Sequence, residues 1–114
     1  MDYVIRVRVK EVRGYCALGY KPGDEFIVEK YFIRANQKIP ICLHALNGII
    51  TLLILMLKGY SAKKLGIGET DDIGYVQCPD PGKPYTSGGT VIFELKRESL
   101  RNVRKNFEET NQSG

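Results

Sequence analysis

The sequence has a single histidine, His44, and no pair of cysteines in a C-x-x-C arrangement. One histidine cannot be assigned to a Ser/His/Asp or Cys/His/Asn catalytic arrangement without geometry. The missing C-x-x-C pairs exclude the usual zinc-ribbon and thioredoxin signatures. The segment "GYKPGDEF" lacks the spaced glycines and the Lys-Ser/Thr pair of a phosphate-binding P-loop. Local motifs therefore name no reaction.

A hydrophobic run long enough to cross a membrane is also missing. Residues 41–57 are the most apolar stretch, but as a helix they would span about 25 Å, less than a hydrocarbon core of about 30 Å. They also contain His44, Asn47 and Thr51. The first ten residues alternate apolar and basic side chains and have no signal-peptide hydrophobic block. We therefore expect a cytoplasmic protein that does not contact a membrane.

Size and composition are those of one globular domain. The chain has 114 residues, of which 43% are hydrophobic and 26% are charged, which is enough apolar material for a single core. Its net charge of +4 is a mild imbalance. It suits an acidic partner without requiring one.

Period-two alternation predicts the first strand over residues 3–10, where Ile5, Val7 and Val9 share one face. A turn at Pro22-Gly23 leads to a second strand over residues 26–32. A helix over residues 41–58 and strands over 73–78 and 90–97 follow. We expect an α+β fold in ββαββ order, with a small antiparallel sheet on one apolar helix. Residues 1–97 form this domain, and 98–114 are a helical extension with a frayed end.

The central helix is apolar on most sides. A narrow polar stripe at helical spacing contains His44, Asn47, Thr51 and Lys58. A helix of this kind needs apolar cover on more than one side. The sheet supplies one cover, and a second protomer of a homodimer is the candidate for the other.

Three cysteines, Cys16, Cys42 and Cys78, stand near the boundaries of the expected elements. A small sheet could bring all three to one end of the domain, where thiolates would bind a soft metal such as zinc or an iron–sulfur centre. The alternative is packing, because free cysteine is often a buried small hydrophobe. Cys42 suits packing best, on the apolar helix face.

A fourth ligand would come from His44 or Asp80. Cys42 and His44 are about 200° apart around a regular helix, so both can face one metal only if the first turn is irregular. The segment "CPDP" offers Asp80 as an oxygen ligand and rigid prolines to hold Cys78 in place. The ordinary interpretation of His44 is a hydrogen-bonded residue of the polar stripe.

One sheet face is basic. Arg6, Arg8 and Lys10 alternate with the apolar residues of the first strand and could contact nucleic-acid phosphates. A solvated outer face of a half-buried sheet explains them better and needs no partner. We therefore do not expect nucleic acid to be the partner.

Three longer segments, "CALGYKPGDEF", "PICLHAL" before an apolar helix, and "VQCPDPG" leading to "VIFELKR", occur in this order. With them the chain resembles a family of short archaeal and bacterial proteins whose activity is not known. The resemblance covers residues 4–97 and departs at Leu43, where the family often has proline. It implies recurring cysteines at the three positions and no particular activity.

Three functions stay open from the sequence. The first is a non-catalytic or accessory protein that binds a soft metal through Cys16, Cys42 and Cys78. The second is a thiol-dependent redox protein or enzyme with Cys42 as nucleophile, because amides at a helix N-terminus favour a thiolate. The third is a dimeric interaction module with inert cysteines. Whether the protein is an enzyme is left undecided.

Overall fold

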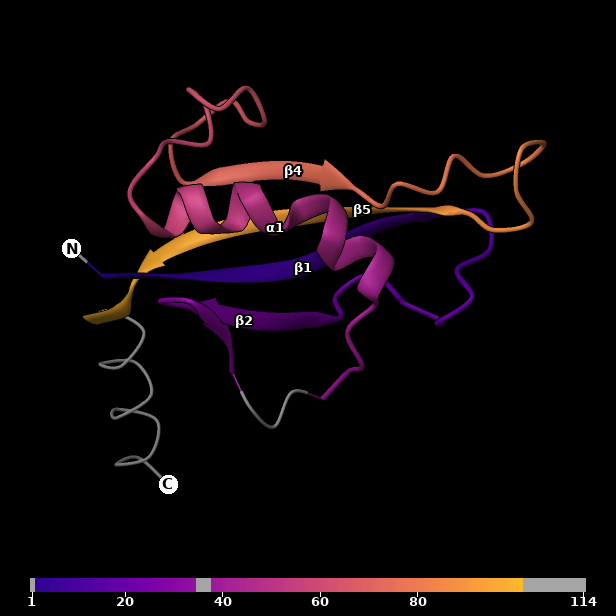
Figure 1. Ribbon diagram of the computed structural model, residues 1–114, viewed down its shortest axis with the longest axis horizontal. Coiled ribbons are helices and arrows are strands. Elements are labelled where there is room, and N and C mark those ends of the chain that lie inside the picture. Colours follow the sequence, from indigo (N-terminus) through magenta and orange to yellow (C-terminus); the bar gives the residue numbers. More distant parts are fainter. Residues whose placement is uncertain (1, 35–37, 102–114) are drawn as a thin grey trace.

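The computed structural model describes residues 2–34 and 38–101, which form one sheet with one helix against it (Figure 1). The elements, in chain order, are β1 (Tyr3–Arg13), β2 (Glu25–Glu29), β3 (Phe32–Ile33), α1 (Leu43–Leu57), β4 (Ile73–Gln77) and β5 (Thr90–Ser99). The sheet has the strand order β3-β2-β1-β5-β4, and every neighbouring pair is antiparallel. The predicted α+β class with an antiparallel sheet is confirmed.

The two longest strands, β1 and β5, lie side by side at the centre of the sheet. Their inward positions alternate as the sequence predicts: Ile5, Val7 and Val9 on β1 are at most 1% exposed. Phe93 and Leu95 on β5 are equally buried and pair with Val9 and Val7. Burial of these side chains beneath α1 removes apolar surface from water, which is the main force that holds the two layers together.

The order of elements differs from the expected ββαββ, because the segment expected as one strand over 26–32 is a hairpin. β2 ends at Glu29, the chain turns at Lys30 with a positive φ of 53°, and Phe32 then begins β3. β3 pairs back with β2, so that Val28 lies opposite Ile33. A tight turn inside an alternating run leaves the alternation nearly intact, so the pattern did not reveal it.

Helix α1 is shorter than the expected 41–58. It begins at Leu43, since Cys42 has an extended backbone with φ −72° and ψ 124°, and it ends before Gly59, whose φ is 103°. The side chains that face the sheet are buried, namely Ala45, Ile49, Leu53, Met56 and Leu57. The stripe of His44, Asn47, Thr51 and Lys58 is exposed, as predicted.

β5 extends to Ser99, beyond the expected end at Arg97, and a helical turn begins at Leu100. The amide of Leu100 donates to the carbonyl of Asp2 and fixes this turn beside the start of β1. The remainder of the expected C-terminal helix, over 102–114, lies outside the described residues. Within the described part of the chain, no helix has the length and apolar character required to cross a membrane.

Candidate functional site

The three cysteines come from remote segments and line one cavity beside the N-terminal end of α1. The cavity has a volume of about 100 Å³, and Cys16, Cys42 and Cys78 all contribute to its wall. Both residues considered as a fourth ligand, His44 and Asp80, line it as well. The sheet and the helix thus bring together side chains that are separated by dozens of residues in the sequence.

Cys42 is the N-cap residue of α1 and makes no side-chain capping hydrogen bond. Because it lies before the helix in extended backbone, it is not part of the buried helix face to which the sequence assigned it. The angular separation of 200° between Cys42 and His44 applies only inside a helix, so it does not keep the two side chains apart here. Both line the cavity.

Tyr20 holds Cys42 in place. Its hydroxyl donates to the carbonyl of Pro40 and accepts from the amide of Cys42, each at 2.9 Å. Its ring packs edge-on against Phe93, with 6.0 Å between the ring centroids. Burial raises the pKa of Tyr20, and the hydrogen bond from the Cys42 amide partly opposes that effect. The hydroxyl therefore stays protonated and keeps both hydrogen bonds at neutral pH.

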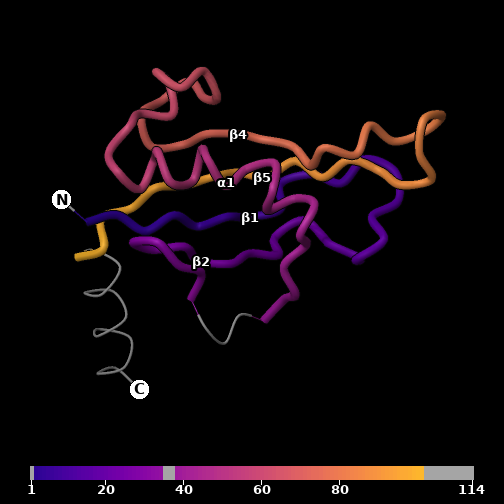
Figure 2. The backbone as a smooth tube through the Cα atoms, in the orientation of Figure 1, coloured from indigo at the N-terminus to yellow at the C-terminus, as the bar shows by residue number. Residues whose placement is uncertain are grey.

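Cys16 lies in the connection between β1 and β2, in a turn closed by a 2.9 Å hydrogen bond from the Gly19 amide to its carbonyl. This connection packs closely against the loop between β4 and β5, which lies beside it in Figure 2. A Cβ on Gly89 would collide with the carbonyl of Arg13, so only glycine permits this approach. The two loops together form one wall of the cavity.

Cys78 follows β4 directly and is 9% exposed, and its amide donates to the carbonyl of Val91 at 2.8 Å. The next residue, Pro79, packs on α1 at Gly48, where an added Cβ would lie 3.3 Å from the proline Cδ. Since the proline ring also fixes the backbone, the chain has little freedom to move Cys78. The Pro-Asp-Pro exit thus anchors Cys78 between sheet and helix.

Asp80 organises the loop that follows. Its carboxylate accepts a hydrogen bond from the Gly82 amide at 2.8 Å and another from the Thr86 hydroxyl. The Thr86 and Gly82 hydrogen bonds, followed by the nearby charge of His44, lower the pKa of Asp80. One oxygen of this carboxylate is therefore already engaged, which makes Asp80 a poorer candidate for a metal ligand than His44.

The cavity is not a preformed metal site. Among the residues that the structure describes, no group of three or more His, Cys, Asp and Glu side chains is arranged so that it could hold a metal ion. The cysteines, His44 and Asp80 therefore line the same cavity without being arranged to coordinate a metal ion. Coordination would require some of these side chains to change their orientation.

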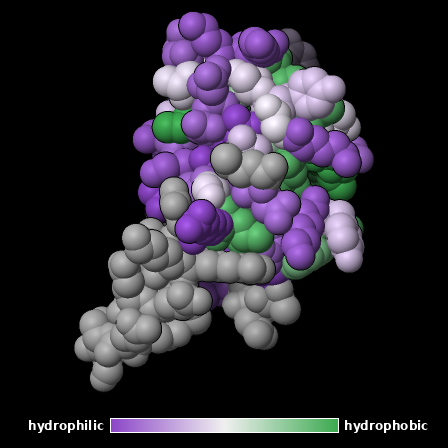
Figure 3. All heavy atoms as spheres, turned by 90° about the vertical axis from the view of Figure 1, so that its left-hand side faces the viewer, coloured by the Kyte–Doolittle hydropathy of each residue, from purple (hydrophilic) through white to green (hydrophobic). Residues whose placement is uncertain are grey.

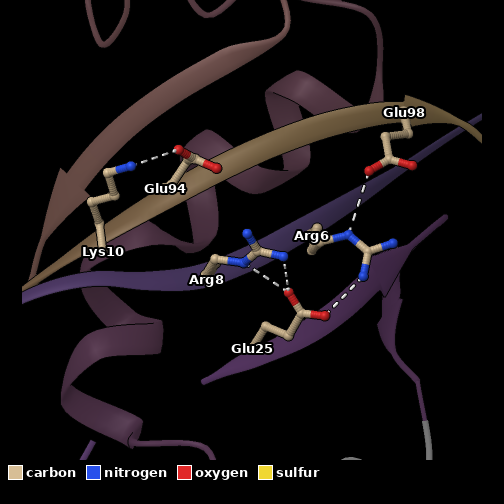
Figure 4. A network of polar contacts seen from close by, with 6 residues as sticks. All are labelled: Arg6, Arg8, Lys10, Glu25, Glu94 and Glu98. Atoms are coloured by element: carbon tan, nitrogen blue, oxygen red, sulfur yellow. Dashed lines mark hydrogen bonds and ion pairs between the residues drawn. The ribbon is translucent and has the colours of Figure 1, made fainter. Parts of the chain in front are cut away.

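The basic residues of β1 lie on the opposite face of the sheet, where each has an acidic partner (Figure 4). Arg6 contacts Glu25 at 2.8 Å and Glu98 at 3.4 Å, and Arg8 shares Glu25. Burial lowers the pKa of Arg6, but the two glutamates outweigh that effect and the pKa is raised.

The third cation of this face, Lys10, contacts Glu94 at 3.8 Å. Each of these three cations therefore has a carboxylate partner, and Lys96 of β5, opposite Arg6, is a further exposed cation on the same face.

Sequence reasoning missed Tyr20, although it positions Cys42. The residue stands in "LGYKPGD", a segment rich in turn residues where a tyrosine is ordinarily exposed. Its 6% exposure results from contacts with residues 40–42 and β5. No local pattern signals such contacts.

Comparisons with family models, with curated proteins and with solved structures find no match for this chain. The family resemblance based on the three cysteine segments stays a prediction. Functional argument therefore depends on the geometry of the cavity.

Proposed function

We propose that this protein is a cytoplasmic accessory protein that binds one soft metal ion in the cavity formed by Cys16, Cys42 and Cys78. The observation that supports the proposal is the convergence of the three cysteines of the chain on one cavity. Packing alone would place buried cysteines wherever small apolar side chains fit. The reducing cytoplasm keeps such thiols available for a metal.

The size of the cavity favours an ion over a larger ligand. Its volume is about 100 Å³, whereas sites for small organic molecules occupy roughly 300–1,000 Å³. An iron–sulfur cluster is ordinarily held by four thiolates, and this chain has three cysteines. Zinc accepts three cysteines and one histidine in a tetrahedral site. We therefore assign zinc as the preferred ion.

His44 is the preferred fourth ligand because it is exposed, at the end of α1 that adjoins the cavity. Asp80 is already engaged by Gly82 and Thr86. A water molecule in place of His44 would leave an open coordination position. If His44 is the fourth ligand, removal of its imidazole weakens metal binding. If water is the fourth ligand, the removal leaves binding unchanged.

The side chains must reorient for this binding, and the energy that metal binding supplies is sufficient. Fixing a side chain costs about 0.5–1.5 kcal/mol. Zinc binding to structural sites in small peptides supplies about 10–16 kcal/mol at neutral pH. Cys16 lies in a turn bounded by Gly14 and Gly19, both with φ of 80°, so the segment that must move is a loop. Cys78, by contrast, is anchored.

The test is zinc titration of reduced, untagged protein, followed by gel filtration and elemental analysis. We expect about one zinc ion per chain, and a loss of affinity of at least tenfold in each of Cys16→Ser, Cys42→Ser and Cys78→Ser. His44→Ala should weaken binding more than Asp80→Asn. Asn47→Ala, on the same polar stripe but outside the cavity, is the matched control and should bind as the wild type does.

A zinc content near zero in fully reduced protein with excess metal would refute the proposal. The thiol-chemistry alternative would then be tested on the same samples through the rate at which iodoacetamide alkylates Cys42. A rate well above that of a free thiol, with Cys16→Ser and Cys78→Ser as controls, would support a nucleophile at the N-terminus of α1. An ordinary rate would leave packing as the role of the three cysteines.

A further inference from the structure

Helix α1 carries a second apolar stripe in addition to the face that covers the sheet. Leu43, Ile50 and Ile54, together with the half-buried Leu46, recur at spacings of three and four residues along one side of the helix. This is the spacing that keeps one seam of a helix turned toward a partner. Leu43 is 77% exposed and Ile50 is 42% exposed, and the neighbouring Ile54 is 44% exposed. The chain's own sheet therefore covers this stripe only in part.

A groove runs between this stripe and the hairpin of β2 and β3. Its volume is about 210 Å³, and its lining is entirely apolar or aromatic. The hairpin contributes Tyr31, Phe32 and Ile33, and α1 contributes five residues from Leu46 to Leu57. The turn at Lys30 projects Tyr31 into solvent, where it is 87% exposed and packs edge-on against Phe32.

Hydrophobic side chains are visible from the end of the molecule that carries this hairpin (Figure 3). The largest of them lie on the right of the view, and others stand apart among hydrophilic side chains. The connected apolar surface is the lining of the groove, and such a surface is characteristic of an interaction site.

The exposed area is large enough for a pair of chains. Leu43, Ile50, Ile54, Tyr31 and Phe32 are 39–87% exposed, and together they expose about 600 Å². Two copies would bury about 1,200 Å², the lower end of the range for specific protein interfaces. This area is at the upper end of the range for the largest apolar patch of a single chain, about 300–600 Å², and such patches are often functional.

We propose that a second copy of this chain covers this face, so that the two α1 stripes pack against each other around a two-fold axis. Such an interface must be self-complementary, and each chain offers both protruding side chains, Leu43 and Tyr31, and a groove that can receive them. The lining contains no charged side chain that would select an acidic or basic partner. The groove and the thiol-lined cavity have no lining residue in common, so dimerisation and metal binding can be tested separately.

The experiment is sedimentation equilibrium of the full chain from about 1 µM to about 1 mM. We expect a dimer, and we expect Ile50→Glu and Ile54→Glu each to raise the dimer dissociation constant at least tenfold. Both side chains are more than 40% exposed, so the monomer should keep its fold, which circular dichroism will verify. Tyr31→Ser, at an 87% exposed position, provides a variant outside the helix that should weaken the dimer in the same direction.

Thr51→Glu is the matched control, because it adds the same charge to the polar stripe of the same helix, farther around from Leu43 and Ile50 than Asn47 is. It should dimerise as the wild type does. A wild-type chain that is monomeric at the highest concentration overturns the proposal, as does a dimer that resists Ile50→Glu. A monomer that binds neutral lipid vesicles through this face would also overturn it and would identify a lipid surface as the occupant.

Discussion

The two ends of α1 differ in whether a side chain forms hydrogen bonds with the helix backbone. At the C-terminal end, the buried guanidinium of Arg97 donates to the carbonyls of Met56 and Tyr60, each at 2.9 Å, and to the Asp72 carboxylate at 3.0 Å. It also lies 4.3 Å from the ring centroid of Tyr3. A cation that satisfies the last carbonyls of a helix stabilises both the helix and its connection.

At the N-terminal end, no side chain caps the helix, and the cap residue is a cysteine that lines a cavity. Tyr20 fixes the Cys42 backbone, while the thiol is left without a capping role. At the C-terminal end a side chain completes the hydrogen bonds of the helix, whereas at the N-terminal end the thiol beside the cavity makes no capping hydrogen bond. A ligand gains the most binding free energy from groups that have no hydrogen-bond partner within the fold.

The largest effect is expected at the C-terminal end, in Arg97→Ala. The substitution leaves two carbonyls without their charged donor and removes the cation above Tyr3, so the free energy of unfolding should fall by about 3 kcal/mol. Urea denaturation measures it. Lys96→Ala, one position away on the outer face of β5, should change stability by less than about 0.5 kcal/mol. An equal loss in both variants would show that Arg97 has no special role.

Tyr20→Phe is an intermediate case that tests how the N-terminal end is held. It removes the donor to Pro40 and the acceptor of the Cys42 amide, which should cost about 1–2 kcal/mol at neutral pH. Zinc affinity should fall as well, because Cys42 loses its anchor. Tyr85→Phe, at an 81% exposed position, is the matched control. Unchanged stability in Tyr20→Phe would show that the Pro40 and Cys42 contacts contribute little.

The stability difference between the wild type and Tyr20→Phe should also depend on pH. Because the pKa of Tyr20 is raised by burial, the unfolded chain releases this proton first, near pH 10. The stability that the protonated hydroxyl supplies is therefore complete below about pH 10 and is lost as the pH rises toward the folded-state pKa. The advantage of wild type over Tyr20→Phe should shrink in that alkaline range. An advantage that grew there would contradict the assignment.

The smallest effect is expected for Asp80→Asn, in the loop beside the cavity. The pKa of Asp80 is lowered by the hydrogen bonds from Thr86 and Gly82, so its carboxylate stabilises the fold above the ordinary aspartate pKa of about 3.9. The wild type should melt slightly higher than Asp80→Asn at pH 7, and this difference should vanish as the pH falls through the lowered pKa. Glu69→Gln, at an exposed position, is the control. A difference that persists in acid would point to an effect other than charge.

Much of the sheet could be predicted from the sequence because each side chain's face follows from its place in the strand. Alternation located β1 and β5 and placed Ile5, Val7 and Val9 on one face of β1. It also contained an unused signal, since Arg97 occupies the next inward position after Leu95, where an unpaired arginine would be costly. The Lys30 turn was missed and the helix start was placed at residue 41 rather than Leu43, because each depends on one residue's backbone angles.

The sequence by itself determined the class of fold, the polar stripe of α1 and the alternation of the basic face, since these follow from local periodicity and from the burial of apolar side chains. Only the tertiary structure decided that Cys16, Cys42 and Cys78 share one cavity, that Arg6 and Arg8 share Glu25 while Arg6 also contacts Glu98, and that Tyr20 is a buried anchor. Those relations join residues remote in the chain. Their distances depend on how strands and loops pack in three dimensions, which no local pattern encodes.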